Sequence, residues 1–194
     1  MKVSEASCAM DWPESSFWNY SLSLYGRPGV EHSCLELQRR HGLDVNLLLF
    51  VFWSSDRGIE VHQAILARAE QAVSTWHVEV IRPLRALRRR LAAQRAKADP
   101  QSLLGQWPNH VAKLQKDVLA IELDGEHLAQ LALTEIGEGL QPTREPGVDL
   151  AGFNLARFCP FCSHDLDDLR IMLKQAFPAT TETEMTGALS SFQA

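Results

Sequence analysis

The chain has 194 residues, of which 45% are hydrophobic and 22% are charged, as in an ordinary globular protein. Its formal net charge of -5 at pH 7 argues against general affinity for nucleic acids. The longest apolar run, Val45 to Trp53, is much shorter than the roughly 20 residues that span a bilayer. Four cysteines do not make the disulfide framework of a small secreted domain, and the N-terminus lacks a signal-peptide pattern. We therefore expect a cytoplasmic protein with reduced thiols.

Three helices are predicted in the first third of the chain. Asp11 is a candidate cap for the first helix, which ends at Gly26. The second helix begins at Val30 and ends at Gly42, a glycine in the usual position after a helix. Asp44 is predicted to cap the third helix, VNLLLFVFW, which is apolar almost all round and should lie in the middle of the core. A buried strand is the alternative for so short an apolar run.

The middle of the chain predicts two longer helices. The first follows a stripe of 3.6-residue period from residue 59 to about residue 98, and Pro83 should kink or divide it. Its leucines Leu84, Leu87 and Leu91 are expected to face the core. The second begins after Pro108 and continues to about residue 136.

These elements predict an all-α helical bundle. We expect a bundle core over residues 1–138, a linker rich in glycine and proline over 139–150, a C-terminal helical pair over 151–177, and a disordered, mobile tail over 178–194.

A set of residues in the first half resembles a known family pattern, FW-x-x-S, CLxLQ, then G-x-DVNLLL and a later tryptophan. The matching positions are Phe17, Trp18, Ser21, Tyr25, Gly29, Val30, Cys34, Leu35, Leu37, Gln38, Gly42, Asp44 to Leu49, Trp53, Trp76, Pro83, Leu84, Arg85 and Arg88. The chain resembles an uncharacterised proteobacterial family defined by a domain of unknown function. The resemblance covers roughly residues 12–140. It implies an all-α fold and a cytoplasmic location, and it implies no activity.

The stretch FCPFCSHDLDD, residues 158–168, has the highest density of reactive residue types. Cys159 and Cys162 have the spacing of a redox dithiol, but the usual β-α-β carrier of that motif is missing. A zinc site would use Cys159, Cys162 and His164 and would lack a nearby fourth ligand. A magnesium site on the aspartates would need a second acidic motif. The alternative is that Ser163 caps a helix, the aspartates are first-turn charges and the cysteines pack, so we predict no metal.

Asn46 lies in the first turn of the buried third helix, where its amide must find hydrogen-bond partners. The predicted polar network, which could line a small-molecule pocket, consists of Tyr25, Gln38, Asp44, Asn46, Trp53 and Arg85. The same network could instead only determine how the helices align.

Arg82, Arg85 and Arg89 share one helix face and form a candidate basic face for a phosphate-rich partner. No interleaved stacking aromatics support nucleic-acid binding, so the alternative is a solvated face that pairs with the acidic second half of the chain.

The sequence contains no complete catalytic constellation. We therefore predict a protein that is not an enzyme, uses no cofactor, and acts as a protein-interaction or adaptor module with a protein partner or by self-association. The alternative is an enzyme or small-molecule binder with a polar pocket within the bundle. A second alternative is nucleic-acid binding through the arginine face.

Overall fold

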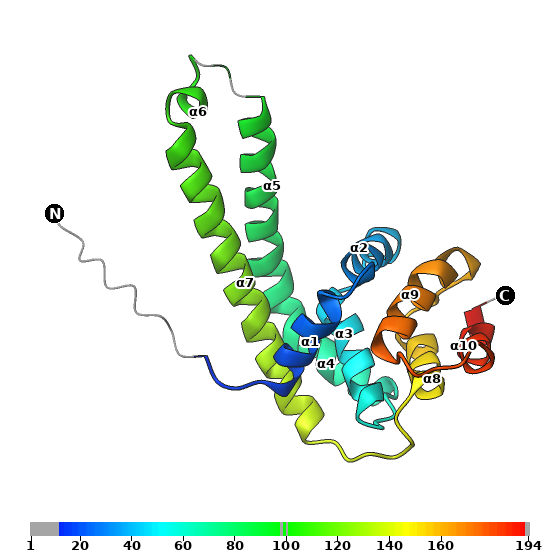
Figure 1. Ribbon diagram of the computed structural model, residues 1–194. Helices are drawn as coiled ribbons and strands as arrows, with labels where there is room; N and C mark the ends of the chain where they lie inside the picture. The colour runs from blue at the N-terminus through cyan, green and yellow to red at the C-terminus, as the bar shows by residue number, and fades with distance from the viewer. Residues whose placement is uncertain (1–11, 98, 100, 193–194) are drawn as a thin grey trace.

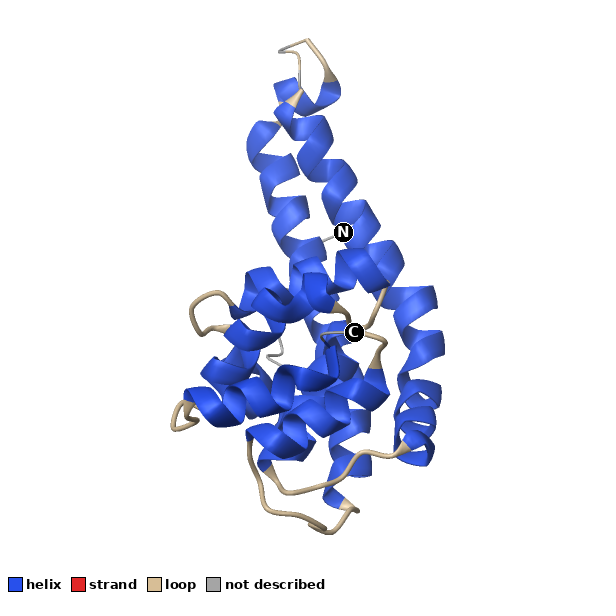
Figure 2. Ribbon diagram, turned by 90° about the vertical axis from the view of Figure 1, so that its right-hand side faces the viewer, coloured by secondary structure: helices blue, strands red, loops and turns tan. Residues whose placement is uncertain are grey.

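The computed structural model describes residues 12–97, 99 and 101–192. Every regular element in this part of the chain is a helix, which confirms the predicted all-α fold (Figure 2). None of the described helices combines the length and the apolar composition that crossing a membrane requires.

The first three helices begin and end at residues whose local chemistry explains them. Helix α1 (Ser16–Tyr25) begins after Ser15, whose hydroxyl accepts the Trp18 N–H, whereas the predicted cap Asp11 lies outside the described residues. Helix α2 (Val30–His41) ends at Gly42, which has a left-handed φ of 66°. The side chain of Asp44 caps α3 (Val45–Asp56) as predicted, by accepting the Asn46 N–H at 2.8 Å.

Helix α3 lies in the middle of the core. All its residues from Asn46 to Ser55 are buried, as the apolar sequence predicts, and the strand alternative is excluded. Helices α1, α2, α7 and α8 pack around it. The hydrophobic cluster at this position includes residues of α1 to α4 and of α7 to α10.

The long helix of the middle region is divided close to Pro83, as predicted. Helix α4 (Gln63–Trp76) continues into a π-helical turn, η1 (His77–Ile81), and then into α5 (Arg82–Ala96). Pro83 has no N–H to donate to the preceding turn. The Arg82 N–H reaches back five residues to the His77 carbonyl, so the wider turn accommodates the interruption.

Helix α5 and the first half of α7 (Pro108–Glu138) form an arm that projects from the body, with α6 (Leu103–Gln106) near its tip (Figure 1). Helix α5 has no buried residue, and none of Leu84, Leu87 and Leu91 belongs to the core cluster, so the expectation that these leucines face the core is wrong. The second half of α7 enters the body, where α7 packs against α1, α3 and α4.

The C-terminal segment, predicted to be a disordered tail, instead forms α10 (Glu182–Leu189) and the short η3 (Ser190–Phe192). Met185, Leu189 and Phe192 are buried. This segment follows α8 (Val148–Phe158), η2 (Ser163–Asp165) and α9 (Leu166–Ala176), and α10 packs on α8 and α9.

Candidate functional site

A groove of about 910 Å³ opens where the end of α2, α4, the π turn, the start of α5 and the end of α8 meet. Its polar lining consists of Gln38, His41, Asp44, Gln63, Glu70, Ser74, His77, Arg82, Arg85, Arg89 and Arg157. Its apolar lining includes Leu43, Leu47, Leu66, Val73, Val78, Ala86 and Phe158. A volume of this size is typical of small-molecule sites.

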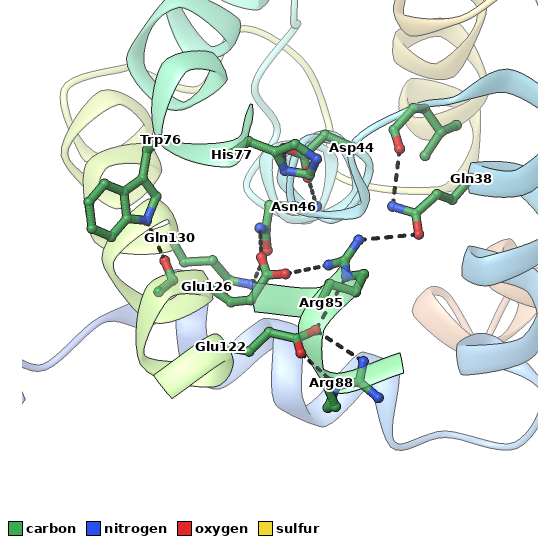
Figure 3. A network of polar contacts seen from close by, with 12 residues as sticks. Gln38, Asp44, Asn46, Trp76, His77, Arg85, Arg88, Glu122, Glu126 and Gln130 are labelled. Atoms are coloured by element: carbon green, nitrogen blue, oxygen red, sulfur yellow. Dashed lines mark hydrogen bonds and ion pairs between the residues drawn. The ribbon is translucent and has the colours of Figure 1, made fainter. Parts of the chain in front are cut away.

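Behind one wall of the groove, α5 and α7 are joined by ion pairs (Figure 3). Arg85 Nε lies 3.3 Å from Glu122 Oε1, and Arg85 Nη2 lies 2.5 Å from Glu126 Oε1. Arg88 donates to both oxygens of Glu122, at 2.6 and 3.1 Å. Burial alone would raise the pKa of Glu122, but Arg88 and then Arg85 outweigh it and hold that pKa below its usual value.

Asn46 extends this network into the core. Its side-chain amide donates to Glu126, and its carbonyl oxygen accepts a hydrogen bond from Gln130 Nε2 at 2.8 Å. Burial raises the pKa of Glu126, while the Asn46 hydrogen bond and the charge of Arg85 oppose that rise. Asn46 is therefore linked to Arg85 through a carboxylate rather than directly.

The structure brings together part of the predicted pocket. Gln38, Asp44 and Arg85 line the groove. Arg85 Nη1 lies 3.5 Å from Gln38 Oε1, and Gln38 in turn donates to the Leu43 carbonyl at 3.3 Å.

The other predicted pocket residues lie away from the groove lining. Asn46 lies behind Glu126, in the network just described. Trp53 packs in the core against Phe17, so close to Gly137 that a Cβ there would lie 2.1 Å from the indole ring. Tyr25 packs at the edge of the core, and burial, followed by the charge of Glu31, raises the pKa of its hydroxyl to about 12. The acidic second half of the chain was a candidate partner for the arginine face, but no local pattern singles out Glu122, Glu126 or Gln130.

His77 is a groove residue that the sequence analysis missed. Its Nδ1 lies 2.9 Å from Asp44 Oδ2, although the two atoms are poorly aligned for a hydrogen bond. The neighbouring Trp76 donates its indole N–H to the Gly125 carbonyl at 2.9 Å, which ties the start of the π turn to α7. The π turn thus places His77 and Val78 on the groove wall.

The candidate basic face also lines the groove, since Arg82, Arg85 and Arg89 all contribute to it. The guanidinium of Arg85 is held by two carboxylates. Among the described residues, Arg82 and Arg89 form no ion pair. Two of the three predicted arginines therefore carry charge that the fold does not neutralise.

Cys159, at the edge of the groove, is not an activated thiol. Burial, followed by the nearby charge of Asp165, raises its pKa to about 11, which opposes thiolate formation. Cys162 Sγ lies 3.8 Å from His164 Nδ1. The part of the chain that the structure describes contains no group of three His, Cys, Asp or Glu side chains that could hold a metal ion.

Asp165 is a buried charged residue at the start of α9. The prediction that Ser163 caps this helix is wrong. The Cys162 N–H donates to Asp165 Oδ2 at 2.9 Å in a capping box, and Cys162 occupies the cap position. Arg40 Nε and His41 Nε2, both from α2, lie 3.0 and 2.9 Å from the Asp165 carboxylate. This carboxylate therefore joins two elements far apart in sequence.

A second candidate site is an apolar stripe on the arm. Trp107, Leu114, Ile121 and Leu128 are 54%, 51%, 54% and 45% exposed. Leu114, Ile121 and Leu128 are spaced by seven residues on α7, so they follow one face of the helix, and Trp107 is its N-cap. We refer to these four residues as the arm stripe.

Comparison with known proteins places the chain in a family. The family model described as "Protein of unknown function (DUF2390)" matches residues 16–133, which confirms the resemblance to a domain of unknown function. The match includes helices α1 to α6 and most of α7, and therefore the arm stripe and the network behind the groove. No curated protein and no solved structure matches the chain significantly. The chain belongs to the family of proteins of unknown function DUF2390.

Proposed function

We propose that this chain is a protein-interaction module whose arm pairs with the arm of a second copy. The arm stripe carries the proposal, because it leaves four large apolar side chains in water at regular spacing along α7. Burying an apolar side chain of this size contributes about 1.5–3 kcal/mol. Regular spacing by seven residues is the pattern with which helices pack along one another.

The charges of α7 favour an antiparallel arrangement of the two copies. From Pro108 to Ile121 the helix exposes Lys113 and Lys116, and after Ile121 it exposes Asp124, whereas Glu122 and Glu126 are already paired with Arg85 and Arg88. A two-fold axis between the arms brings the lysines of each α7 towards Asp124 of the other. In this arrangement Leu114 lies opposite Ile121.

The substitution Ile121→Asp tests the pairing. A carboxylate in the middle of the stripe should weaken self-association at least about 100-fold, because two copies of the charge are buried across the axis. Light scattering after size-exclusion chromatography and sedimentation equilibrium measure the change. Circular dichroism should remain unchanged, since Ile121 is exposed in the single chain.

Ala120→Asp is the matched control, because Ala120 is exposed, adjacent and outside the stripe. It should leave self-association intact. A wild-type chain that stays monomeric at high micromolar concentration would contradict the proposal, as would equal effects of the two substitutions.

Lys113 and Asp124 flank the stripe and test the antiparallel order. Asp124→Lys and Lys113→Glu should each weaken pairing, and the double charge reversal should restore it. A double variant weaker than either single variant would exclude this arrangement.

A further inference from the structure

The groove has an excess of positive charge on its walls. Four arginines line it, Arg82, Arg85, Arg89 and Arg157, against the two carboxylates Asp44 and Glu70. Asp44 already lies against His77. Arg157 stacks over the Phe153 ring at 3.5 Å and is 3.9 Å from Glu60, so its head group lies at the rim.

The wall formed by α5 carries two arginines that form no ion pair among the described residues, Arg82 and Arg89. Arg82, Ala86 and Arg89 follow one face of the helix at intervals of four and three residues. Ala86, which lies between them along this face, is half-buried and has a short side chain. Arg85, which also lines the groove, is held in place by Glu122 and Glu126.

The groove also has apolar lining residues. Leu47 and Leu66 are 9% and 8% exposed, and they line the groove together with Leu43, Val73 and Phe158. An arginine fork binds carboxylate or phosphate oxygens with two parallel hydrogen bonds. The groove therefore combines cationic donors with an apolar surface.

The backbone supports a binding role at the same place. The π turn His77–Ile81 lies at the groove and contributes His77 and Val78 to the lining. Single π-helical turns occur often at functional sites. Pro83 explains why the turn is tolerated, but not why a groove opens beside it.

We propose that this groove binds a small organic oxyanion, a carboxylate or phosphate carried on an apolar body. Arg82 and Arg89 bind the oxyanion beside Ala86, and Leu47, Leu66 and Phe158 contact the apolar body. The proposal is independent of arm pairing, because it rests on α2, α4, α5 and α8 rather than on the arm stripe.

Four probes separate the contribution of the oxyanion from that of the apolar body. Octanoate and octyl phosphate carry both an oxyanion and an apolar chain, octanol carries only the chain, and inorganic phosphate carries only the oxyanion. Isothermal titration calorimetry on the full chain should detect octanoate or octyl phosphate at millimolar concentration, and the better of the two identifies the oxyanion. Octanol and inorganic phosphate should each bind at least roughly tenfold more weakly. No binding of either amphiphilic anion, or equal binding of octanol, overturns the proposal.

Substitutions on α5 locate the binding. Arg89→Gln and Arg82→Gln should each lower affinity roughly tenfold, as expected for the loss of a charge-assisted hydrogen bond. Arg90→Gln is the control, because it removes the same charge from the same helix outside the groove lining. Ala86→Leu changes no charge and introduces another good helix former, but its larger side chain occupies the proposed oxyanion position, so it should abolish binding.

An equal loss with Arg90→Gln would mean a general electrostatic effect and would overturn the proposal. The same conclusion would follow if Ala86→Leu bound octanoate or octyl phosphate like the wild type. A short single-stranded DNA that binds more tightly than the amphiphilic anions, with affinity lost equally in Arg89→Gln and Arg90→Gln, would assign the arginines to nucleic acid instead.

Discussion

The carboxylate of Asp165 is fully buried and joins the start of α9 to the end of α2. It accepts the Cys162 N–H and lies against Arg40 and His41. Burial alone would raise its pKa, but the backbone N–H of Cys162, then His41 and Arg40, outweigh that effect and hold the pKa below its usual value. The folded chain therefore prefers the ionised carboxylate.

We expect Asp165→Asn to lower the free energy of unfolding at pH 7 by about 1.5–3 kcal/mol, because it removes the negative charge from the contacts that the buried side chain makes with the Cys162 N–H and Arg40. Since the pKa of the carboxylate is lower in the folded chain, its stabilisation is present above the unfolded pKa of about 3.9 and is lost as pH falls through the folded pKa. The difference from wild type should thus be full at pH 7 and shrink in strong acid. Urea denaturation at several pH values measures it.

Asp167→Asn is the control for this prediction, because Asp167 is exposed in the same motif. It should change the free energy of unfolding by at most about 0.5 kcal/mol. Equal effects at the two aspartates would contradict the role that the structure gives to Asp165.

At the residue scale, the sequence predicted helix caps and helix ends, which depend on neighbouring residues. It did not predict side-chain contacts between residues far apart in the chain. Asp44 and Gly42 could be identified because a cap and a helix end involve residues only a few positions apart. The hydrogen bond from Asn46 to Glu126 spans 80 residues and the pair of His41 with Asp165 spans 124. No local pattern encodes such pairs.

At the scale of elements, the buried α3 was the clearest prediction and α10 was the clearest error. A short helix that is apolar on every face is expected to be buried, and α3 is buried. Helix α10 has only 8 residues, too few to show a helical period, but it carries a readable capping box. The Thr181 hydroxyl accepts the Glu184 N–H at 3.3 Å, and Glu184 accepts the Thr181 N–H at 2.8 Å.

Leu189→Ala measures whether α10 belongs to the core. Leu189 is 1% exposed, so its truncation should lower the free energy of unfolding by about 2–5 kcal/mol. Thr183→Ala, at an exposed position of the same helix, should change it by at most about 0.5 kcal/mol. Urea denaturation followed by circular dichroism compares them. Wild-type stability in Leu189→Ala would support the disordered tail that the sequence predicted.

At the scale of the whole molecule, the arm was not foreseen. The leucines of α5 follow one face of the helix. This sequence pattern does not distinguish a helix that packs on a core from a helix that packs on a single neighbouring helix. Only the structure shows that α5 packs mainly on α7 and leaves the body (Figure 1). The charges do carry a trace of this pairing, since α5 has six arginines and no acidic residue, whereas α7 has six acidic residues.

The tip of the arm divides the chain into two halves that fold around each other. Helices α1 and α4 pack on α7, α3 packs on α8, and α2 packs on α9. Neither half can bury α3 or α7 alone.

A chain cut between α5 and α6 should therefore reassemble from its two fragments. Co-expressed fragments 1–97 and 98–194 should co-purify with the helical content of the intact protein, and each fragment alone should be unfolded. Independent folding of either fragment would contradict this. Fragments that reassemble in this way would report the proximity of two proteins fused to them, with the cut placed at the tip of the arm and away from the core.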